Sequence, residues 1–115
     1  MMVYKKPLKQ YDIILANLDP TVGKEIKKTR PVVVVSKNDM NKYLDTIVVC
    51  PLTISLHPKW RSRIQIICNN EKAEIAVDQI RTISKIRIIR KIESLSAENA
   101  YLLRKLITEM YGESD

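Results

Sequence analysis

The chain has 115 residues, 45% of them hydrophobic, which is enough for one domain with a core of its own and too few for two. Its 20 Lys and Arg outnumber 13 Asp and Glu, so the formal net charge is +7. This composition excludes a disordered chain and favours a polyanionic partner (RNA, DNA or an acidic protein segment), although a basic domain without such a partner has the same charge.

Short strands are predicted in the first part of the chain. A basic arm over residues 1–10 leads into a strand over residues 11–18, which ends at the turn-forming pair Asp19-Pro20. The polar loop over residues 21–29 holds Gly23. In a chain so poor in glycine, we expect Gly23 to have a positive φ that other residues resist.

A buried strand and a short helix are predicted next. Pro31 holds Arg30 in an extended backbone and opens a run of four valines over residues 32–35. Such a β-branched run predicts a strand covered on both faces. The segment Ser36-Lys37-Asn38-Asp39 resembles a capping box with Asp in place of Glu, which predicts a helix from there to about Tyr43.

The middle of the chain predicts three further strands. The first covers residues 46–52, where Pro51 indicates a sheet edge or a bulge. A basic loop over residues 55–63 precedes strands at 64–68 and 73–77, with a turn at Asn69-Asn70. An irregular turn over residues 78–85 is expected next, followed by a strand-like but ambiguous segment over residues 86–92.

The last element is an amphipathic helix. Ser96 is a good N-cap, Glu98 favours the first turn, and Gly112 supplies the C-terminal stop. The helical stripe consists of Leu102, Leu103, Leu106, Ile107 and Met110. Many short strands without βαβ alternation predict a mainly β protein with helices: a small antiparallel barrel, covered by this helix, in a single domain over residues 1–115.

The sequence lacks the residues that several kinds of functional site require. Cys50 and Cys68 lie in apolar runs and are predicted to be buried free thiols, and His57 is the only histidine. A histidine-pair ribonuclease is therefore impossible, and no metal or other cofactor is expected, although scattered acids leave a two-metal nuclease open. No apolar run is long enough for a membrane span or a signal peptide, so we expect a cytoplasmic protein without membrane contact.

Four segments, in this order, resemble the MazF/PemK family of toxin ribonucleases. They are the loop Leu18-Asp19-Pro20-Thr21-Val22-Gly23-Lys24-Glu25, the strand Thr29-Arg30-Pro31-Val32-Val33-Val34-Val35-Ser36, the triplet Pro51-Leu52-Thr53 and the segment Val77-Asp78-Gln79-Ile80-Arg81-Thr82-Ile83. Each segment alone is a weak signal, but the ordered set spans nearly the whole domain. The chain departs from the family pattern at Ile26, where many relatives have Gln, and at Lys27-Lys28-Thr29, where a small or glycine-rich stretch is usual.

The resemblance implies a fold, an activity and partners. The fold is an SH3-like antiparallel barrel with a C-terminal helix, of the CcdB/MazF type, in a homodimer. The activity is sequence-specific, metal-independent cleavage of single-stranded RNA, with attack of the 2′-OH leaving a 2′,3′-cyclic phosphate and a 5′-OH. The protein partner is a cognate antitoxin with an acidic, flexible tail, which suits the +7 charge.

The resemblance also assigns site residues. Arg30 matches the catalytic arginine, Thr53 the threonine on the scissile phosphate, and Glu25 a glutamate of the same loop. Arginine is too basic to accept a proton, so Arg30 is expected to stabilise charge and Glu25 to be the candidate base. A salt bridge to a neighbouring lysine is the other interpretation of Glu25, and an ordinary strand threonine that of Thr53. Ala76 stands where one branch of the family has a catalytic arginine, which moves the assignment to Arg30 and Thr53.

Cations cluster in the same segments and are expected to bind RNA phosphates. They are Lys24, Lys27, Lys28, Lys59, Arg61, Arg63, Arg81 and Lys85. Trp60 either stacks on an unpaired base or closes the barrel end. Asp78 and Gln79 are expected to pin the turn that shapes the floor of the groove, and His57 to be an ordinary loop histidine.

Two other functions remain open at this point. A barrel of the same shape can act as a protein-binding toxin of the gyrase-directed type, or as a nucleic-acid-binding module without catalysis. Fold alone does not choose among them, because function depends on the site residues.

Overall fold

The computed structural model describes residues 4–112, so the first three residues of the predicted arm lie outside the described part of the chain. Seven strands form one antiparallel sheet. They are β1 (Asp12–Asn17), β2 (Thr29–Val34), β3 (Thr46–Thr53), β4 (Arg63–Cys68), β5 (Glu71–Ala76), β6 (Arg81–Ser84) and β7 (Ile88–Ser94). Two α-helices, α1 (Asn38–Tyr43) and α2 (Ala97–Tyr111), and two 3-10 turns, η1 (Val77–Gln79) and η2 (Lys85–Arg87), complete the fold.

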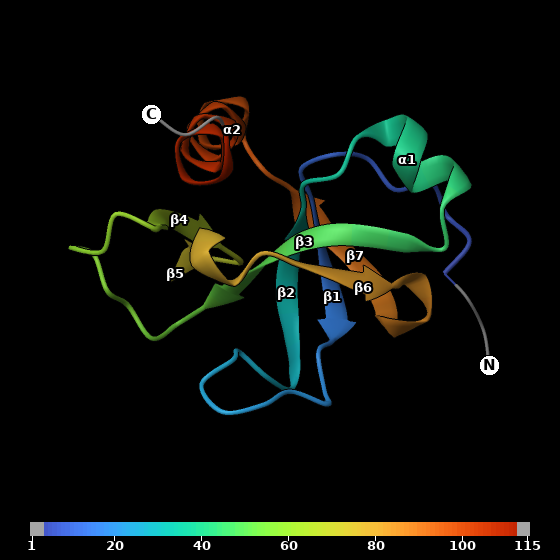
Figure 1. Cartoon of the computed structure of the whole chain (residues 1–115), viewed down its shortest axis with the longest axis horizontal. Coiled ribbons are helices and arrows are strands. Elements are labelled where there is room, and N and C mark those ends of the chain that lie inside the picture. The colour runs from blue at the N-terminus through green and yellow to red at the C-terminus, as the bar shows by residue number, and fades with distance from the viewer. Residues whose placement is uncertain (1–3, 113–115) are drawn as a thin grey trace.

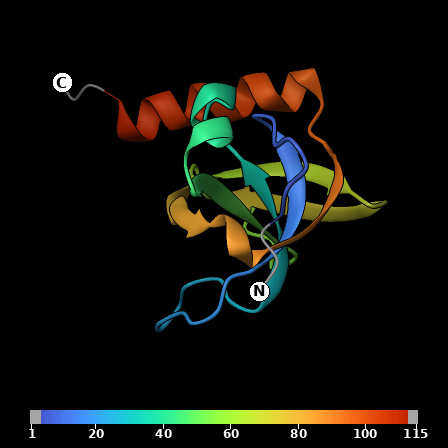
Figure 2. The same cartoon turned by 90° about the vertical axis from the view of Figure 1, so that its right-hand side faces the viewer.

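The sheet curls because β3 has different partners at its two ends. The strand order is β4-β5-β3-β2-β1-β7, with β6 also paired to β3. On one edge β3 pairs with β2, and on the other it pairs with β6 over Thr46–Val49 and with β5 over Leu52–Thr53. The sheet therefore divides around β3 and wraps into a half-barrel, with α2 across one open side (Figure 1; Figure 2). The predicted mainly β barrel with a C-terminal helix is confirmed.

Two apolar cores lie on opposite faces of the central strands. Val33 packs beneath α2 with Ile13, Cys50, Ile75 and others, whereas Val32 and Val34 face the other core. All three valines are fully buried, as the β-branched run predicted. The two cysteines are buried and free. Burial, with the nearby charge of Asp78 as a lesser cause, raises the pKa of Cys50 to about 12.

Pro51 lies in a central strand and not at a sheet edge. Its partner across β2 is Val32, and Val35 N–H donates to Val48 O, so antiparallel alternation turns the Pro51 nitrogen towards the opposite edge. On that edge Pro51 falls between the stretch paired with β6 and the stretch paired with β5. No ladder bond is lost there, which explains how an interior strand tolerates proline.

Other local predictions were only partly right. The helix α1 begins without a side-chain cap, because Ser36 bonds instead to buried Asn41 and to Val48 N–H. The expected irregular turn over residues 78–85 contains strand β6, which pairs with β3. Gly23 has φ +61°, as predicted, and Asn69 and Asn70 make a two-residue turn with both φ values positive.

Helix α2 covers the first core through one face. Leu103 is fully buried, and Leu106 and Ile107 pack partly against the core. Leu102 and Met110, which were predicted in the same stripe, are 43% and 36% exposed. Ser96 accepts the Asn99 N–H as the N-cap, and Gly112 ends the helix. Among residues 4–112, no helix combines the length and the hydrophobicity that crossing a bilayer requires.

Candidate active site

Arg30 and Thr53 come together in one pocket at the end of the sheet. The β2–β3 register ends at the pair Val32–Pro51, and Arg30 and Thr53 each lie two residues beyond it on their strands. Both residues line a cavity of about 120 Å³, whose walls also include Pro31, Leu52, Ile54, Cys68, Asn69, Glu71 and Ala73. Two residues that are 23 positions apart in the sequence therefore meet at one pocket.

The backbone before β2 orients the Arg30 guanidinium. Lys28 has φ +69°, a left-handed conformation, and the turn that follows lets Arg30 Nε donate to Lys27 O at 2.9 Å. Neither Nη group of Arg30 has a hydrogen-bond acceptor among the described residues. The side chain is thus anchored by one N–H and presents the rest of its planar fork to a ligand.

Thr53 is buried, and its hydroxyl has a defined orientation. Thr53 Oγ1 accepts the Ser55 N–H at 3.0 Å, and the residue is 9% exposed. Because a hydroxyl that accepts one bond still carries its own hydrogen, Thr53 retains a donor for a group in the pocket. Arg30 and Thr53 together offer N–H and O–H donors of the kind that bind a phosphate oxygen.

The structure places Glu25 apart from these two residues. Glu25 Oε1 accepts Val22 N–H at 2.6 Å within its own loop, and none of the three lysines considered as ion-pair partners is bonded to it. It lines a different cavity, of about 430 Å³, with Lys24, Asp78, Gln79 and Arg81. The carboxylate that shares the pocket of Arg30 and Thr53 is Glu71, which the sequence analysis did not single out.

Three side chains hold the β1–β2 loop against the sheet. Gln79 Oε1 accepts the Ile26 N–H at 2.6 Å, and Arg81 Nη1 donates to Leu18 O at 3.2 Å. Arg87 donates to Asn17 O at 3.1 Å and also to Asp19 O. Gln79 and Arg81 thus hold the β1–β2 loop to the segment that follows β5. One donor of the Arg81 guanidinium is used in this contact and is not available to a ligand.

Arg63 is not a surface cation. Its side chain is 5% exposed and forms ion pairs with Glu74 at 3.1 Å and with Asp78 at 2.8 Å. Strand β4 turns Arg63 to these two carboxylates, and its contact with RNA phosphates stays a prediction. Asp78, expected to pin a turn, does so through Arg63.

Glu74 is the buried hub of this cluster, and sequence reasoning missed it. It pairs with Thr53 across β3 and β5, is fully buried, and accepts hydrogen bonds from Gln65, Arg63 and the His57 N–H. Burial by itself raises the pKa of Glu74, but the bonds from Gln65, His57 and Arg63 outweigh it and hold the pKa below its ordinary value. The His57 bond fastens the loop that follows Thr53. Only the β3–β5 pairing reveals this neighbour, so no sequence pattern could have found it.

The other predicted cations lie on two loops and, for Lys85, in a cavity beside α1. Lys24, Lys27 and Lys28 are exposed on the β1–β2 loop, and Lys59 and Arg61 on the loop after β3. Trp60 is 48% exposed, stacks on His57 at 3.9 Å between ring centroids, and has the Arg63 guanidinium 4.7 Å away. Lys85 instead lines a cavity beside α1, apart from these two loops, and its contact with RNA stays a prediction. Within residues 4–112, no three His, Cys, Asp or Glu side chains gather as metal ligands.

Known proteins match this chain in sequence and in fold. The sequence profile of the PemK-like, MazF-like toxin of type II toxin-antitoxin systems matches residues 9–111. The Endoribonuclease MazF of Staphylococcus epidermidis is 32% identical over 94 residues, covering 77% of this chain and 78% of the relative. The same figures hold for the Endoribonuclease MazF of Staphylococcus saprophyticus.

Solved structures share the fold at lower identity. MazF from Deinococcus radiodurans superposes with a TM-score of 0.83 at 17% identity, covering 95% of this chain and 100% of the other. The Mycobacterium tuberculosis toxin MazF-mt6 gives a TM-score of 0.75 at 20% identity, covering 90% and 99%. The ordered motifs, the half-barrel and these matches agree, and the chain belongs to the PemK-like, MazF-like family of type II toxin–antitoxin toxins.

Proposed function

We propose that this chain is an endoribonuclease toxin that cleaves single-stranded RNA at the pocket between Arg30 and Thr53. The observation that carries the proposal is that these two residues line one small cavity, each with a donor that its own hydrogen bond leaves available. Relatives named Endoribonuclease MazF support the activity, and one similar solved structure is a MazE–MazF complex. The partner is accordingly an acidic antitoxin, and the compartment of action is the cytoplasm.

The reaction is an internal transfer at phosphorus. The 2′-OH attacks the adjacent phosphorus, its proton passes to a base, and the P–O5′ bond breaks while the leaving oxygen gains a proton. The products are a 2′,3′-cyclic phosphate and a 5′-OH. Arg30 stabilises the extra negative charge of the phosphorane with its planar donors, and Thr53 adds a hydroxyl donor from its buried position.

The base is a carboxylate in this proposal. Glu25 is assigned by resemblance and lines a different cavity, whereas Glu71 lines the pocket itself. The RNA runs along the exposed lysines of the β1–β2 loop and the cations after β3. A homodimer extends this surface, and the exposed apolar side chains of the monomer, such as Tyr43 and Ile67, support association.

The test is cleavage of long single-stranded RNA by purified protein in EDTA. We expect the wild type to cut and to leave cyclic-phosphate ends, and Arg30→Ala to lose about 10²–10³ in rate because one oxyanion donor is worth that much. The matched control is Arg104→Ala on α2, which should cut normally. Cleavage that stops in EDTA would contradict metal independence. RNA binding without cleavage would indicate a non-catalytic module, and neither binding nor cleavage would indicate a protein-binding toxin.

A further inference from the structure

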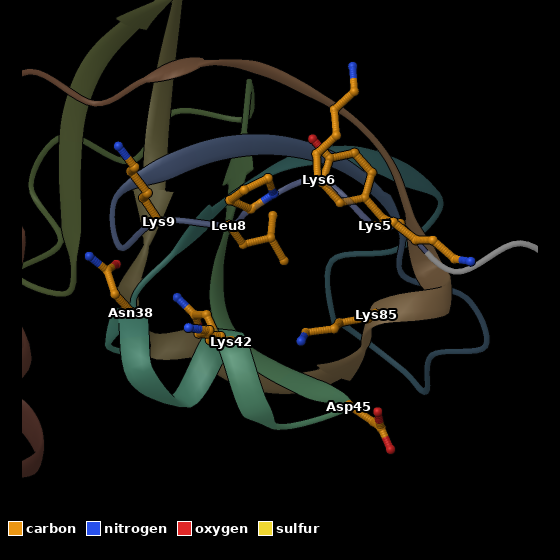
Figure 3. A pocket seen from close by; sticks show the side chains of 11 residues that line it. Lys5, Lys6, Leu8, Lys9, Asn38, Lys42, Asp45 and Lys85 are labelled. Atoms are coloured by element: carbon orange, nitrogen blue, oxygen red, sulfur yellow. The ribbon is translucent and has the colours of Figure 1, made fainter.

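A second basic cavity lies between the N-terminal arm and α1. It measures about 630 Å³ and is lined by the arm over residues 4–9, by Asn38, Asn41 and Lys42 of α1, and by Asp45 and Lys85. Figure 3 shows Leu8 of the arm above Lys42 of α1 and Lys85, which enters from the other side, while Asp45 points away. The basic arm and Lys85 have no role in the pocket of Arg30 and Thr53.

Positive charge is concentrated on this face. Lys5, Lys6, Lys9, Lys42 and Lys85 line the cavity, and Asp45 is the one carboxylate among its described lining residues. A second cavity shares the arm and adds Arg90 and Lys91, of which Lys91 pairs with Asp12 at 3.2 Å. We call the two cavities together the arm groove. Seven of the chain's 20 Lys and Arg therefore face it, more than in any other cavity described above.

The first cavity of the arm groove lies at the other end of β3 from the proposed cleavage pocket. Asp45 precedes the first residue of β3, whereas Thr53 is its last residue. At about 3.3 Å per residue, the strand separates the two sites by about 25 Å. That distance corresponds to about seven nucleotides at the 3.4 Å spacing of a stacked strand. One RNA molecule that is longer than the cleavage site can therefore reach both.

We propose that the arm groove is an accessory site for the phosphodiester backbone of the substrate RNA. This inference rests on the proposed function, since it concerns the same substrate. The cations of the first cavity are all lysines, and Arg90 of the second cavity adds a guanidinium. Lysine binds phosphate as a point charge and arginine binds it through a planar fork, so both kinds of cation suit the phosphates of a flexible single strand. Exposed lysine–carboxylate pairs contribute little.

The experiment measures RNA binding separately from cleavage. In the Arg30→Ala background, which keeps the RNA intact, Lys42→Gln/Lys85→Gln is compared with the control pair Arg104→Gln/Lys105→Gln, which removes the same charge from α2. The probes are mixed-sequence RNAs of 6 and 30 nucleotides across a salt series. A second variant, Lys5→Gln/Lys6→Gln, changes only exposed arm residues, so that a folding defect in the first pair does not end the test.

The proposal predicts a loss that depends on RNA length. Each lost phosphate contact should lower the slope of log affinity against log salt by about 0.7, so the groove variants should lower it by about 1.4 for the long RNA only. An unchanged slope in the groove variants, or an equal loss in the α2 control, would overturn the proposal. So would a loss of binding to a poly-glutamate peptide with RNA binding intact, which would assign the groove to an acidic partner. Absence of cleavage with length-dependent binding would refute only the proposed function.

Discussion

At the scale of single residues, the chemistry depends on hydrogen-bond donors that the fold leaves unused. Arg30 gives one N–H to Lys27 O, and the Thr53 hydroxyl accepts one N–H while keeping its own proton. These bonds fix the direction of both side chains and leave further hydrogen-bond donors available to a ligand. An arrangement prepared in this way stabilises developing charge without reorganising during the reaction.

Thr53→Val tests the hydroxyl directly, because valine keeps the shape and removes the donor. We expect kcat to fall about 10²-fold while KM changes little, since the bond is made chiefly in the transition state. Thr53→Ser should keep most of the activity. A Thr53→Val enzyme with normal kcat would show that Thr53 is an ordinary strand residue.

The choice of base is testable through pH. Of the two candidates, Glu71 lines the pocket and Glu25 is engaged with Val22 N–H. We therefore expect Glu71→Gln to remove the acidic limb of the kcat/KM profile and to lower the rate about 10²–10⁴-fold. Glu25→Gln should retain that limb. The reverse result would return the role to Glu25, as the resemblance assigns it.

At the scale of elements, the ion-pair cluster of Arg63, Glu74 and Asp78 joins β4, β5, η1 and the loop after β3. Arg63 bridges the two carboxylates, and Glu74 also accepts the His57 N–H. Burial raises the pKa of Asp78, but its bonds to Arg63 and Ser62 and the charge of Arg63 hold it below the ordinary value, as for Glu74. The cluster thereby positions the backbone beside Thr53.

Stability should fall in acid because of this cluster. A carboxylate whose pKa is lowered by folding stabilises the protein above its unfolded pKa, and this contribution is lost as the pH falls through the folded pKa. We expect the thermal midpoint to drop below about pH 4, where unfolded Glu and Asp begin to take up protons. The drop in the thermal midpoint should be smaller in Glu74→Gln than in the wild type. A wild-type midpoint that does not depend on pH would contradict the prediction.

Removing Arg63 alone should lower the free energy of unfolding strongly. Arg63→Met leaves a buried carboxylate without its partner, which costs about 3–5 kcal/mol of the free energy of unfolding. The double variant Arg63→Met/Glu74→Leu should cost less than the single one, because it removes both buried charges. Urea unfolding of the two variants decides this. Equal losses of stability in the two variants would show that Arg63 and Glu74 interact only weakly.

At the scale of the whole molecule, the monomer exposes several large apolar side chains. Tyr43 is 76% exposed, and Ile54 and Ile67 are each 68% exposed. We expect sedimentation equilibrium to give twice the chain mass of 13.3 kDa at micromolar concentration. A mass that stays monomeric at every concentration, with RNA cleavage intact, would contradict the proposed homodimer.

The sequence by itself determined the class of fold and the family. The valine run, the turn residues and the helical stripe predicted a small antiparallel barrel with a C-terminal helix, because burial on both faces, turn chemistry and helical period are local properties of the chain. The order of four motif segments identified the family and put Arg30 and Thr53 forward. Strand β6 escaped detection because its short sequence carries no period, and its pairing with β3 is a long-range contact.

Only the tertiary structure decided which residues meet. Folding brings Arg30, Thr53 and Glu71 around one pocket, and strand register pairs Glu74 with Thr53. It also turns Arg63 inward and carries Lys85 to the far end of β3. Charge in a sequence does not reveal these differences, because the role of an arginine or lysine depends on whether folding supplies it with a carboxylate or leaves it facing solvent.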